Sequence, residues 1–473
     1  MRTPLLLALV LSLAPRASAQ LALPPDGGGA APGLDGPADH LPVDARLRIQ
    51  AELDGTLQHL NARGVLPDGA ARRARLPGLA WPLRATTSDP GVHGVSNYVD
   101  LNGDANAVQD YTCGSRTYDR DDYDHPGIDY FTWPFGWSKM DGQEVQVVAA
   151  APGTIIGTAD GNDDRSCTID FDKPWNAVYV VHDDGSTAWY GHLKNGSVTR
   201  AAVGTRVEAG DVLGIVGSSG ASSGPHLHFE LHDAQGETVE PHTGPCNPGA
   251  SGWLEQRPYR DSAINALMTH SAAPGFASCP STRESPHRSS AFQPGDDVIT
   301  AAYYRDQVRG QTTTYAVLDP DGFPHREWSH VAPTTYNASY WYWTTPIPQN
   351  ATQGTWTFTA TYNGVTTTHP FTVGAVTVDA EPEPDDAFVA SAFAPHPVRG
   401  LTRFTLSVAQ PQRVRVRVLD TLGRELASAL DDGLAAGVER TVELSTDGLA
   451  AGAYLVRIEG ETFRTVRPLT VAR

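Results

Sequence analysis

Basic residues are in short supply in this chain of 473 residues. Its 35 lysines and arginines are outnumbered by 54 aspartates and glutamates, which gives a formal net charge of −19 at pH 7. Because nucleic acids and anionic membrane surfaces are bound through basic patches, this balance argues against either as a partner. The length itself suffices for about three domains.

Long hydrophobic runs are also missing. The run from Leu5 to Leu13 is too short to span a bilayer comfortably. Arg2 precedes it and an Ala-Ser-Ala triplet follows it, so residues 1–19 are predicted to be a secretory signal peptide. No later stretch is apolar enough for a membrane helix. We therefore expect a soluble mature protein without a transmembrane segment, secreted or held at the cell surface after export to the periplasm.

Cysteine is scarce, with four residues in the whole chain. Their spacings are too wide for a CxxC zinc site. An even number of cysteines in an exported chain predicts two disulfides, and four cysteines allow three pairings. Order along the chain favours Cys113–Cys167 and Cys246–Cys279.

The N-terminal part combines a turn-rich stretch with one helical pattern. Residues 20–40 are rich in Gly, Pro and Ala and are expected to be disordered. Gly64 ends the helical pattern that follows them. We interpret residues 20–89 as either a propeptide or an N-terminal brace, and the alternative for the helix is a plain surface helix. One amphipathic helix is predicted there by apolar residues at helical spacing: Ile49, Leu53, Leu57 and Leu60.

The rest of the chain is predicted to be mainly β. Residues 90–282 hold strand-like runs such as NAVYVVHDDGSTAWYGHL between turns, which predicts an antiparallel β-sheet domain. Residues 290–375 carry short strands and an Asn-Gly hairpin signal, typical of an immunoglobulin-like sandwich. An acidic, Pro-containing linker at 376–387 leads to residues 388–473. There, valines alternate with arginines in RVRVRV, which predicts a small C-terminal β-sandwich.

The stretch GPHLHFEL concentrates polar groups on an otherwise apolar strand. Side chains alternate across a strand, so His226, His228 and Glu230 are expected on one face, with Leu227 and Phe229 on the other. Two imidazoles on one face are costly to bury without partners, but they are suited to hold a metal ion. Glu230 is either the group that orients a ligand imidazole or a solvated carboxylate at the strand end.

Two further elements supply imidazole and carboxylate groups. DHPGIDY places His125 and Asp129 four residues apart, around a Pro-Gly turn that runs into a strand. WYGHLKNG places His192 at the end of another strand-like run. This mixture of ligands suits zinc, with three protein ligands and an open position for water. The chain has no HExxH helix, which excludes a thermolysin-like arrangement.

These motifs resemble the M23 family of zinc metallopeptidases, the lysostaphin- and LytM-type enzymes that cut peptidoglycan cross-links. HPGID, YGHL and SSGASSGPHLHFE follow one another in order, with AVGTRVEAGDVLGIVG between the last two. The resemblance covers residues 95–250, and the connection at 131–141 is longer and more aromatic than is usual in the family. The resemblance implies one Zn²⁺ ion per chain, with His125, Asp129 and His228 as its ligands. It also implies that His192 and His226 are the two catalytic histidines.

The C-terminal segment is similar to the type IX secretion sorting domain of the Bacteroidota and their relatives. The shared features are the Pro-containing opening FAPHPVRG, the turn DTLGR, and LAAGAYLVR near the end. The resemblance implies that the type IX machinery is a partner and that the tail is removed or used for surface attachment. The alternative is a second accessory sandwich.

Three functions follow as hypotheses. The first is a secreted, monomeric zinc metalloendopeptidase that hydrolyses peptide bonds in peptidoglycan cross-links or stem peptides. The second is the same chemistry on Gly-rich or elastin-like proteins, and Trp133 and Trp137 are expected to line the cleft for either class of substrate. The third is a non-catalytic scaffold that binds the cell wall. Stacked aromatic residues at 340–343 would also suit a carbohydrate-binding module, although such a strand is normally part of a core.

Overall fold

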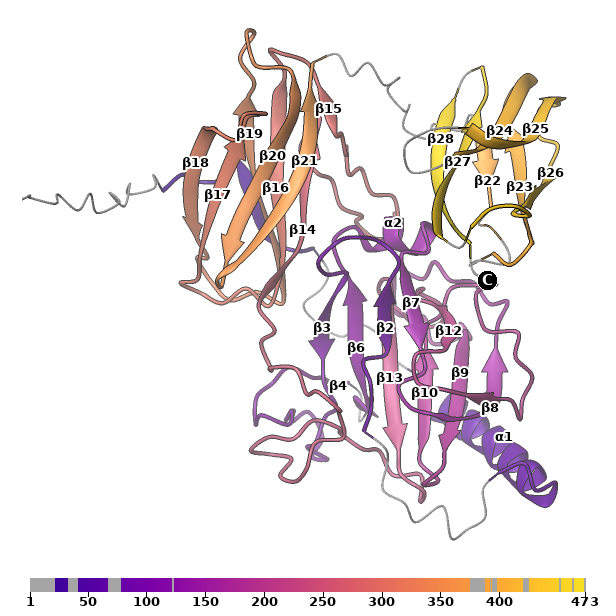
Figure 1. Ribbon diagram of the computed structural model, residues 1–473. Coiled ribbons are helices and arrows are strands. Elements are labelled where there is room, and N and C mark those ends of the chain that lie inside the picture. The colour runs from indigo at the N-terminus through magenta and orange to yellow at the C-terminus, as the bar shows by residue number, and fades with distance from the viewer. Residues whose placement is uncertain are drawn as a thin grey trace, which may run out of the picture. The chain divides into compact units, whose positions relative to one another are not determined.

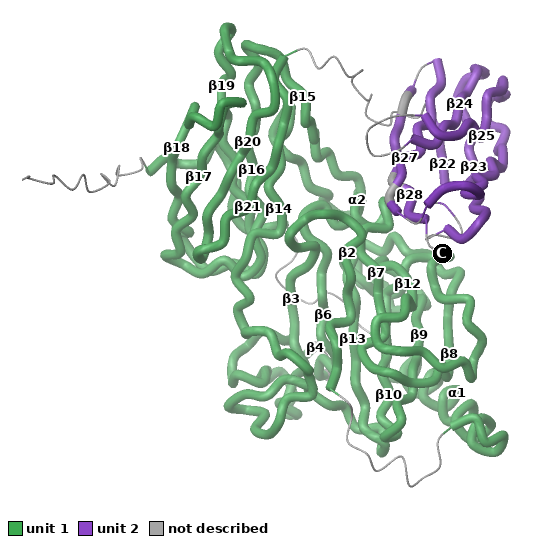
Figure 2. Tube along the Cα trace, in the orientation of Figure 1, with its two compact units in different colours: residues 1–375 green, residues 376–473 purple. Residues whose placement is uncertain are grey.

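The computed structural model shows a mainly β protein, as predicted, whose chain divides into two compact units, residues 1–375 and 376–473 (Figure 2). The predicted signal peptide and the predicted linker lie outside the described residues. Among the residues described, no helix has the length and apolar character needed to cross a membrane. The described residues are 22–32, 41–66, 78–120, 123–374, 388–391, 393, 398–419, 425–450, 452–461 and 463–471.

The first unit contains a seven-stranded antiparallel sheet (Figure 1). It runs in the order β11-β8-β9-β10-β13-β6-β3, so β13 lies between β10 and β6. Its strands are β3 (His93–Asn97), β6 (Gly127–Thr132), β8 (Gly153–Ala159), β9 (Ala177–His182), β10 (Thr187–Gly191), β11 (Arg206–Val207) and β13 (His226–His232).

A smaller sheet shares a core with one face of this large sheet. Ile128, Val147, Val180, Leu213 and Leu227 are among the fully buried residues of that core. Burying this apolar surface contributes about 25 cal/mol per Å². The smaller sheet has the order β12-β7-β2, with strands β2 (Leu83–Ala85), β7 (Val145–Val148) and β12 (Val212–Ile215). The short strands β4 (Asp119–Arg120) and β5 (Tyr123–Asp124) pair with each other, and the short helix α2 (Gly136–Asp141) follows β6.

The predicted amphipathic helix is present as α1 (Val43–Ala62). Leu53 and Leu60 are buried in a cluster with Trp175, Tyr179 and Trp189 from the large sheet and its loops. Gly64 follows the helix with φ of +67°, and its amide bonds to the carbonyl of Asn61. Such a left-handed conformation favours glycine, which explains why the helix ends there.

A β-sandwich completes the first unit. Its core is rich in aromatic residues, including the fully buried Trp328 and Trp343. One sheet has the order β1-β19-β16-β14, and the other β15-β21-β20-β17-β18. The strands are β1 (Gly27–Ala30), β14 (Ala263–His270), β15 (Ala291–Phe292), β16 (Asp297–Arg305), β17 (Thr312–Leu318), β18 (Pro324–Val331), β19 (Ala338–Pro346), β20 (Gly354–Tyr362) and β21 (Val365–Val373).

Two strands of the sandwich differ from what the sequence suggests. β14 precedes residue 290, where the sandwich was expected to start. It belongs to the sandwich nevertheless, since it pairs with β16 along its whole length. β1 lies within residues 20–40, which were expected to be disordered. It pairs with β19, where a side chain at Gly27 or Gly28 would clash with Tyr342 and Trp341. The glycines that suggest disorder are therefore what allows this close approach.

The second unit is a small β-sandwich with its own core. On β24, Val414, Val416 and Val418 are buried, whereas Arg413 and Arg415 are exposed, which confirms the predicted alternation. The turn DTLGR lies outside the described residues. The sheets have the orders β22-β23-β26 and β25-β24-β27-β28, with strands β22 (Phe388–Ala390), β23 (Leu401–Val408), β24 (Gln412–Leu419), β25 (Glu425–Leu434), β26 (Arg440–Ser445), β27 (Gly452–Glu459) and β28 (Arg464–Val471).

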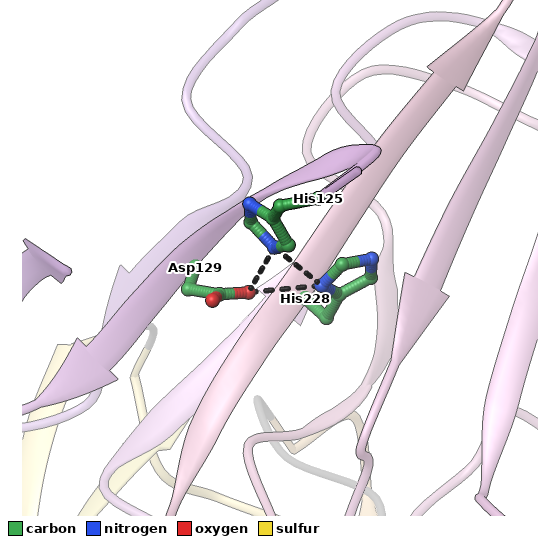
Figure 3. Close-up of side chains that lie close together, drawn as sticks. All are labelled: His125, Asp129 and His228. Atoms are coloured by element: carbon green, nitrogen blue, oxygen red, sulfur yellow. Dashed lines mark hydrogen bonds and ion pairs between the residues drawn. The ribbon is translucent and has the colours of Figure 1, made fainter. Parts of the chain in front are cut away.

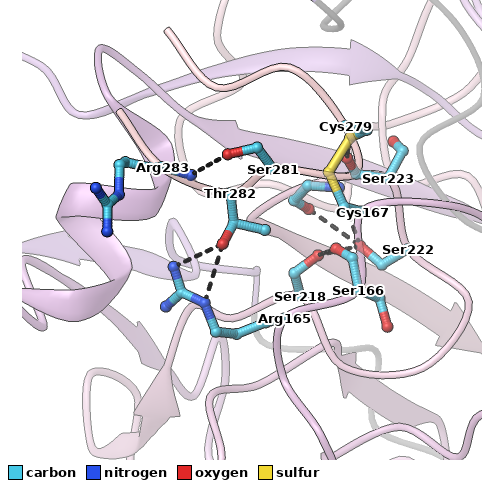
Figure 4. Close-up of a disulfide and its surroundings, with 11 residues drawn as sticks. Arg165, Ser166, Cys167, Ser218, Ser222, Ser223, Cys279, Ser281, Thr282 and Arg283 are labelled. Atoms are coloured by element: carbon cyan, nitrogen blue, oxygen red, sulfur yellow. Dashed lines mark hydrogen bonds between the residues drawn. A yellow bond between two sulfur atoms is a disulfide. The ribbon is translucent and has the colours of Figure 1, made fainter. Parts of the chain in front are cut away.

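The four cysteines form two disulfides, but the pairing expected from chain order is wrong. One bond is Cys113–Cys246. The other is Cys167–Cys279, which Figure 4 shows. The amide of Cys246 bonds to the carbonyl of Tyr111, so the fold brings these two distant loops side by side. Chain order fails because each disulfide joins loops that the sheets place together, over separations of 133 and 112 residues.

Candidate metal centre

Three of the predicted site residues meet on two neighbouring strands. β6 and β13 are antiparallel, and Asp129 lies directly opposite His228 in their register. His125 comes from the turn that leads into β6. His228 Nδ1 lies 2.9 Å from Asp129 Oδ1, and His125 Nε2 lies 3.2 Å from that oxygen and 3.4 Å from His228 Nδ1 (Figure 3). All three side chains are buried.

The alternation of β13 explains how His228 reaches this point. Leu227 and Phe229 are buried in the core between the two sheets, so the histidines face away from it. Gly127 lies across from this strand, and a Cβ there would be 2.7 Å from Nε2 of His228. Gly127, the first residue of β6, therefore leaves the space that the imidazole occupies.

Hydrogen bonds fix which atom of each of the three residues faces the cluster. Nδ1 of His125 donates to the carbonyl of Tyr98 at 2.8 Å, so Nε2 is the nitrogen turned toward the cluster. The amide of Asn97 donates to Oδ2 of Asp129 at 2.9 Å, so Oδ1 is the oxygen turned toward the histidines. Nε2 of His228 lies 2.9 Å from Glu230 Oε1, which leaves Nδ1 for the cluster. Three donor atoms thus converge within 4.8 Å of one another.

Glu230 is fully buried, so it is not a solvated carboxylate at a strand end. His232 Nε2 donates to Oε2 at 2.7 Å, and Arg46 of α1 binds both oxygens, at 2.6 and 2.7 Å. Burial alone would raise the pKa of Glu230, but the charge of Arg46 and the hydrogen bonds from Arg46, His228 and His232 hold that pKa well below its usual range. Glu230 is therefore a charged acceptor that fixes the ring of His228.

The two histidines predicted to be catalytic lie beside this cluster. Nε2 of His226 is 3.8 Å from Asp129 Oδ1. The rings of His192 and His226 lie 4.4 Å apart, centre to centre. Nδ1 of His192 donates to the carbonyl of Ser219 at 2.5 Å, and Nδ1 of His226 to that of Gly224 at 2.8 Å. In both rings Nδ1 is therefore the nitrogen that donates to the backbone.

A cavity of about 380 Å³ opens next to His226. Trp133 and Trp137 line it, from the aromatic connection at 131–141. A second wall comes from residues 276–279 and Glu284, which the disulfide Cys167–Cys279 ties to the large sheet's loops (Figure 4). This wall was not predicted, because nothing in its sequence marks it as part of a site.

Other features of the site were also missed by sequence reasoning. Arg46, Asn97 and Tyr98 contact site residues from segments that carry no motif. His232, which had no motif support, contacts Glu230. Only the period-2 pattern of β13 could have suggested His232, because it places this residue on the face of His226, His228 and Glu230.

Comparisons with known proteins agree with the motif order. Residues 125–241 match the model of peptidase family M23. The chain is 33% identical over 107 residues to the murein hydrolase activator EnvC of Escherichia coli (strain K12), covering 21% of this chain and 25% of that protein. It is 41% identical over 66 residues to the DD-carboxypeptidase/endopeptidase Mpg of Neisseria meningitidis serogroup B, covering 14% of each. The chain therefore spans a quarter or less of the length of these relatives.

A third relative is the glycyl-glycine endopeptidase ALE-1 of Staphylococcus capitis, 45% identical over 56 residues, which are 12% of this chain and 15% of that protein. Among solved structures, the catalytic domain of the antimicrobial peptidase lysostaphin from Staphylococcus simulans is 24% identical, with 30% of this chain and 89% of that chain covered and a TM-score of 0.19. The catalytic domain of EnpA from Enterococcus faecalis is 26% identical, with 33% and 92% covered and a TM-score of 0.20.

Proposed function

We propose that this chain, which carries a peptidase domain of family M23 at residues 125–241, is a secreted zinc metalloendopeptidase. The observation that carries the proposal is the convergence of His125 Nε2, Asp129 Oδ1 and His228 Nδ1, each turned toward the others by a hydrogen bond at its opposite atom. Two imidazole nitrogens and one carboxylate oxygen are a donor set that zinc accepts in catalytic sites, with a fourth position left for water.

The donor set therefore fits one Zn²⁺ ion, held by these three residues. When bound, the ion would polarise the scissile carbonyl and lower the pKa of a coordinated water molecule. The chain's own acid–base groups are His192 and His226. One imidazole accepts the proton of the attacking water, and the other, when protonated, stabilises the negative charge on the carbonyl oxygen and donates a proton to the leaving amine.

The proposed substrate is a peptide of the bacterial cell wall, in a cross-link or a stem peptide. Support comes from the relatives, whose names describe a murein hydrolase activator, a DD-carboxypeptidase/endopeptidase and a glycyl-glycine endopeptidase. The name of the first relative, a murein hydrolase activator, is also compatible with a non-catalytic role. Against that role, this chain keeps His192 and His226 side by side next to the three ligands.

The export of this peptidase is also a proposal. We infer that residues 1–19 direct secretion and that residues 388–473 act as a type IX secretion sorting domain. The C-terminal unit is a small sandwich with its own core, as a separate sorting domain would be. The protein would then work as a monomer outside the cell or on its surface.

Metal analysis and peptidoglycan digestion test the proposal together. Purified protein should contain about one zinc per chain, and new amino termini, mapped by mass spectrometry after digestion of purified peptidoglycan, should name the bond that is cut. His228→Ala should abolish both results. His325→Ala, at an exposed position in the sandwich, is the matched control and should change neither.

Three results would contradict the proposal in different ways. A zinc-free protein, or full activity in His228→Ala, would overturn the metallopeptidase. Zinc binding without any cleavage would favour the scaffold. Cleavage of elastin but not of peptidoglycan would replace the proposed substrate with Gly-rich proteins.

A further inference from the structure

Helix α1 reaches the metal centre through one side chain. Arg46 lies in its first turn, and its guanidinium forms a two-pronged ion pair with Glu230 of β13, from NH1 to Oε2 at 2.6 Å and from NH2 to Oε1 at 2.7 Å. These two residues are 184 positions apart in the sequence. The Arg46 side chain is 20% exposed, whereas that of Glu230 has no exposed surface.

Glu230 passes this contact on to a metal ligand. Its Oε1 accepts hydrogen bonds from both Arg46 and Nε2 of His228. The other nitrogen of the same ring, Nδ1, is the atom that faces Asp129 at 2.9 Å. The orientation of the His228 ring is therefore set by a carboxylate whose own position is set by Arg46. Such partners of ligand histidines keep the ring in the orientation that binds metal.

The carboxylate depends on the guanidinium for physical reasons. A buried carboxylate is strongly unfavourable unless it is paired and fully hydrogen-bonded. His232 supplies one hydrogen bond to Oε2, but Arg46 supplies two and carries a permanent charge. Without Arg46, Glu230 would keep only the hydrogen bonds from the imidazoles of His228 and His232. It would lose the ion pair with helix α1 that fixes its carboxylate.

The position of Arg46 is itself well fixed. Its guanidinium lies 5.4 Å from the ring centre of Trp189, on the strand next to β13. Farther along the helix, Leu53 and Leu60 are buried against the same face of the sheet. The helix lies within residues 41–66, outside the residues 125–241 that match the family model.

We propose that Arg46 is a positioning residue for the metal centre: it acts through Glu230 to hold His228 in its metal-binding orientation, so α1 is a working part of the peptidase. This inference rests on the proposed zinc site. Among the interpretations of residues 20–89 it favours a brace, because removing the helix would remove a group on which the site depends.

Zinc affinity of the full-length protein is the main test, measured by competition with a chelator of known affinity. Arg46→Met keeps an aliphatic side chain against Trp189 but removes the charged guanidinium that binds both oxygens of Glu230. It should weaken zinc binding about 10- to 100-fold. Arg46→Lys keeps the charge without the guanidinium and should have an intermediate effect. The matched control is Arg48→Met on the same helix, whose partner is the exposed Asp44, and it should bind zinc as the wild type does.

Two further measurements separate positioning from general damage to the fold. The absorption spectrum of the Co²⁺-substituted protein should change in Arg46→Met but not in Arg48→Met, because it reports on the ligands themselves. Glu230→Gln and the double variant Arg46→Met/Glu230→Gln complete a cycle. If Arg46 acts through Glu230, the zinc affinity of the double variant should equal that of whichever single variant binds zinc less tightly. The losses in affinity of the two single variants should not add.

The outcomes distinguish this inference from the proposed function. A wild-type protein that binds no zinc overturns both. A wild type that binds zinc, with Arg46→Met equal to it in affinity and Co²⁺ spectrum, overturns the inference and leaves the proposed function standing. Additive losses in the double variant also overturn it. If Arg46→Met does not fold, Arg46→Lys and Glu230→Gln decide, and wild-type zinc affinity in both contradicts the inference.

Discussion

The side-chain amide of Asn97 donates a hydrogen bond of 2.9 Å to Oδ2 of Asp129, from the strand next to β6. Both residues are buried, and the bond leaves Oδ1 as the oxygen that faces the two histidines. Asn97 thus has the same relation to the carboxylate ligand that Glu230 has to His228.

Replacing Asn97 with Ala should therefore weaken zinc binding, by about 10-fold or more, because Asp129 loses the group that fixes its orientation. Chelator competition measures the change. Asn350→Ala, at an exposed position, is the control. Equal zinc affinity in Asn97→Ala and the wild type would show that Asp129 is held by the strand alone.

Removing either proposed acid–base group should separate catalysis from metal binding. His192→Gln and His226→Gln should each lower the rate of peptide hydrolysis by about 10²- to 10⁴-fold. Both should keep one zinc per chain, since neither residue is among the three converging ligands. Metal analysis beside a peptidoglycan digestion checks this. Loss of zinc from either variant would mean that the histidine is a ligand and not a proton carrier.

Adding one methyl group at Gly127 should disturb His228. The Cβ of Gly127→Ala would lie 2.7 Å from Nε2 and Cε1 of that ring and 2.9 Å from the carbonyl oxygen of Phe229, so the imidazole must move. We expect a clear loss of zinc affinity. Gly103→Ala is the matched control, because its Cβ meets no atom within 4 Å. If the two variants bind zinc equally well, the ring has more room than the structure indicates.

Breaking the disulfide Cys167–Cys279 should affect substrate binding more than chemistry. The bond ties residues 276–279, one wall of the cavity beside His226, to the loop that carries Cys167. The double variant Cys167→Ser/Cys279→Ser should raise KM and lower the free energy of unfolding by about 2–5 kcal/mol, with zinc content unchanged. Steady-state kinetics measure the first effect. A lowered kcat with an unchanged KM would contradict this prediction, because it would show that the disulfide supports the chemical step and not substrate binding.

Stability should fall as the pH falls, in part because of His270. Burial lowers the pKa of His270 to about 3. The unfolded chain, with an ordinary histidine pKa near 6.5, then binds this proton more readily than the folded one. The contribution of the neutral His270 to the free energy of unfolding is therefore complete above about pH 6.5. It is lost as the pH falls toward 3, at up to about 1.4 kcal/mol per pH unit.

His270→Gln tests this pH dependence. Its free energy of unfolding should depend less steeply on pH between 6 and 4 than that of the wild type, whereas the exposed His325→Gln should follow the wild type. Equal slopes in all three proteins would mean that His270 does not titrate between the folded and unfolded states in this range.

The sequence predicted those parts of the site that depend on local periodicity. The alternation of HLHFEL correctly placed Leu227 and Phe229 in the core and the histidines on the other face, because a strand has a fixed period of two. The helix and its end at Gly64 followed from spacing and from the conformational freedom of glycine in the same way.

What the sequence could not predict is long-range. Arg46, Asn97 and the wall at 276–279 reach the site only through the packing of segments far apart in the chain. The disulfides are another case, since chain order favoured neighbours whereas the sheets bring distant loops together. No local pattern marks these residues, because their roles arise only when the sheets are assembled.

The N-terminal segment has a consequence for the order of folding. Asp26 bonds to the amide of Thr344, 318 residues later, and Arg46 bonds to Glu230, 184 residues later. Because closing long loops costs entropy, this early segment is expected to take its place only after the strands that it contacts have formed. Because Glu230 comes only two residues after His228, the helix cannot complete its contact with the proposed metal site before the last of the three candidate ligands has been made.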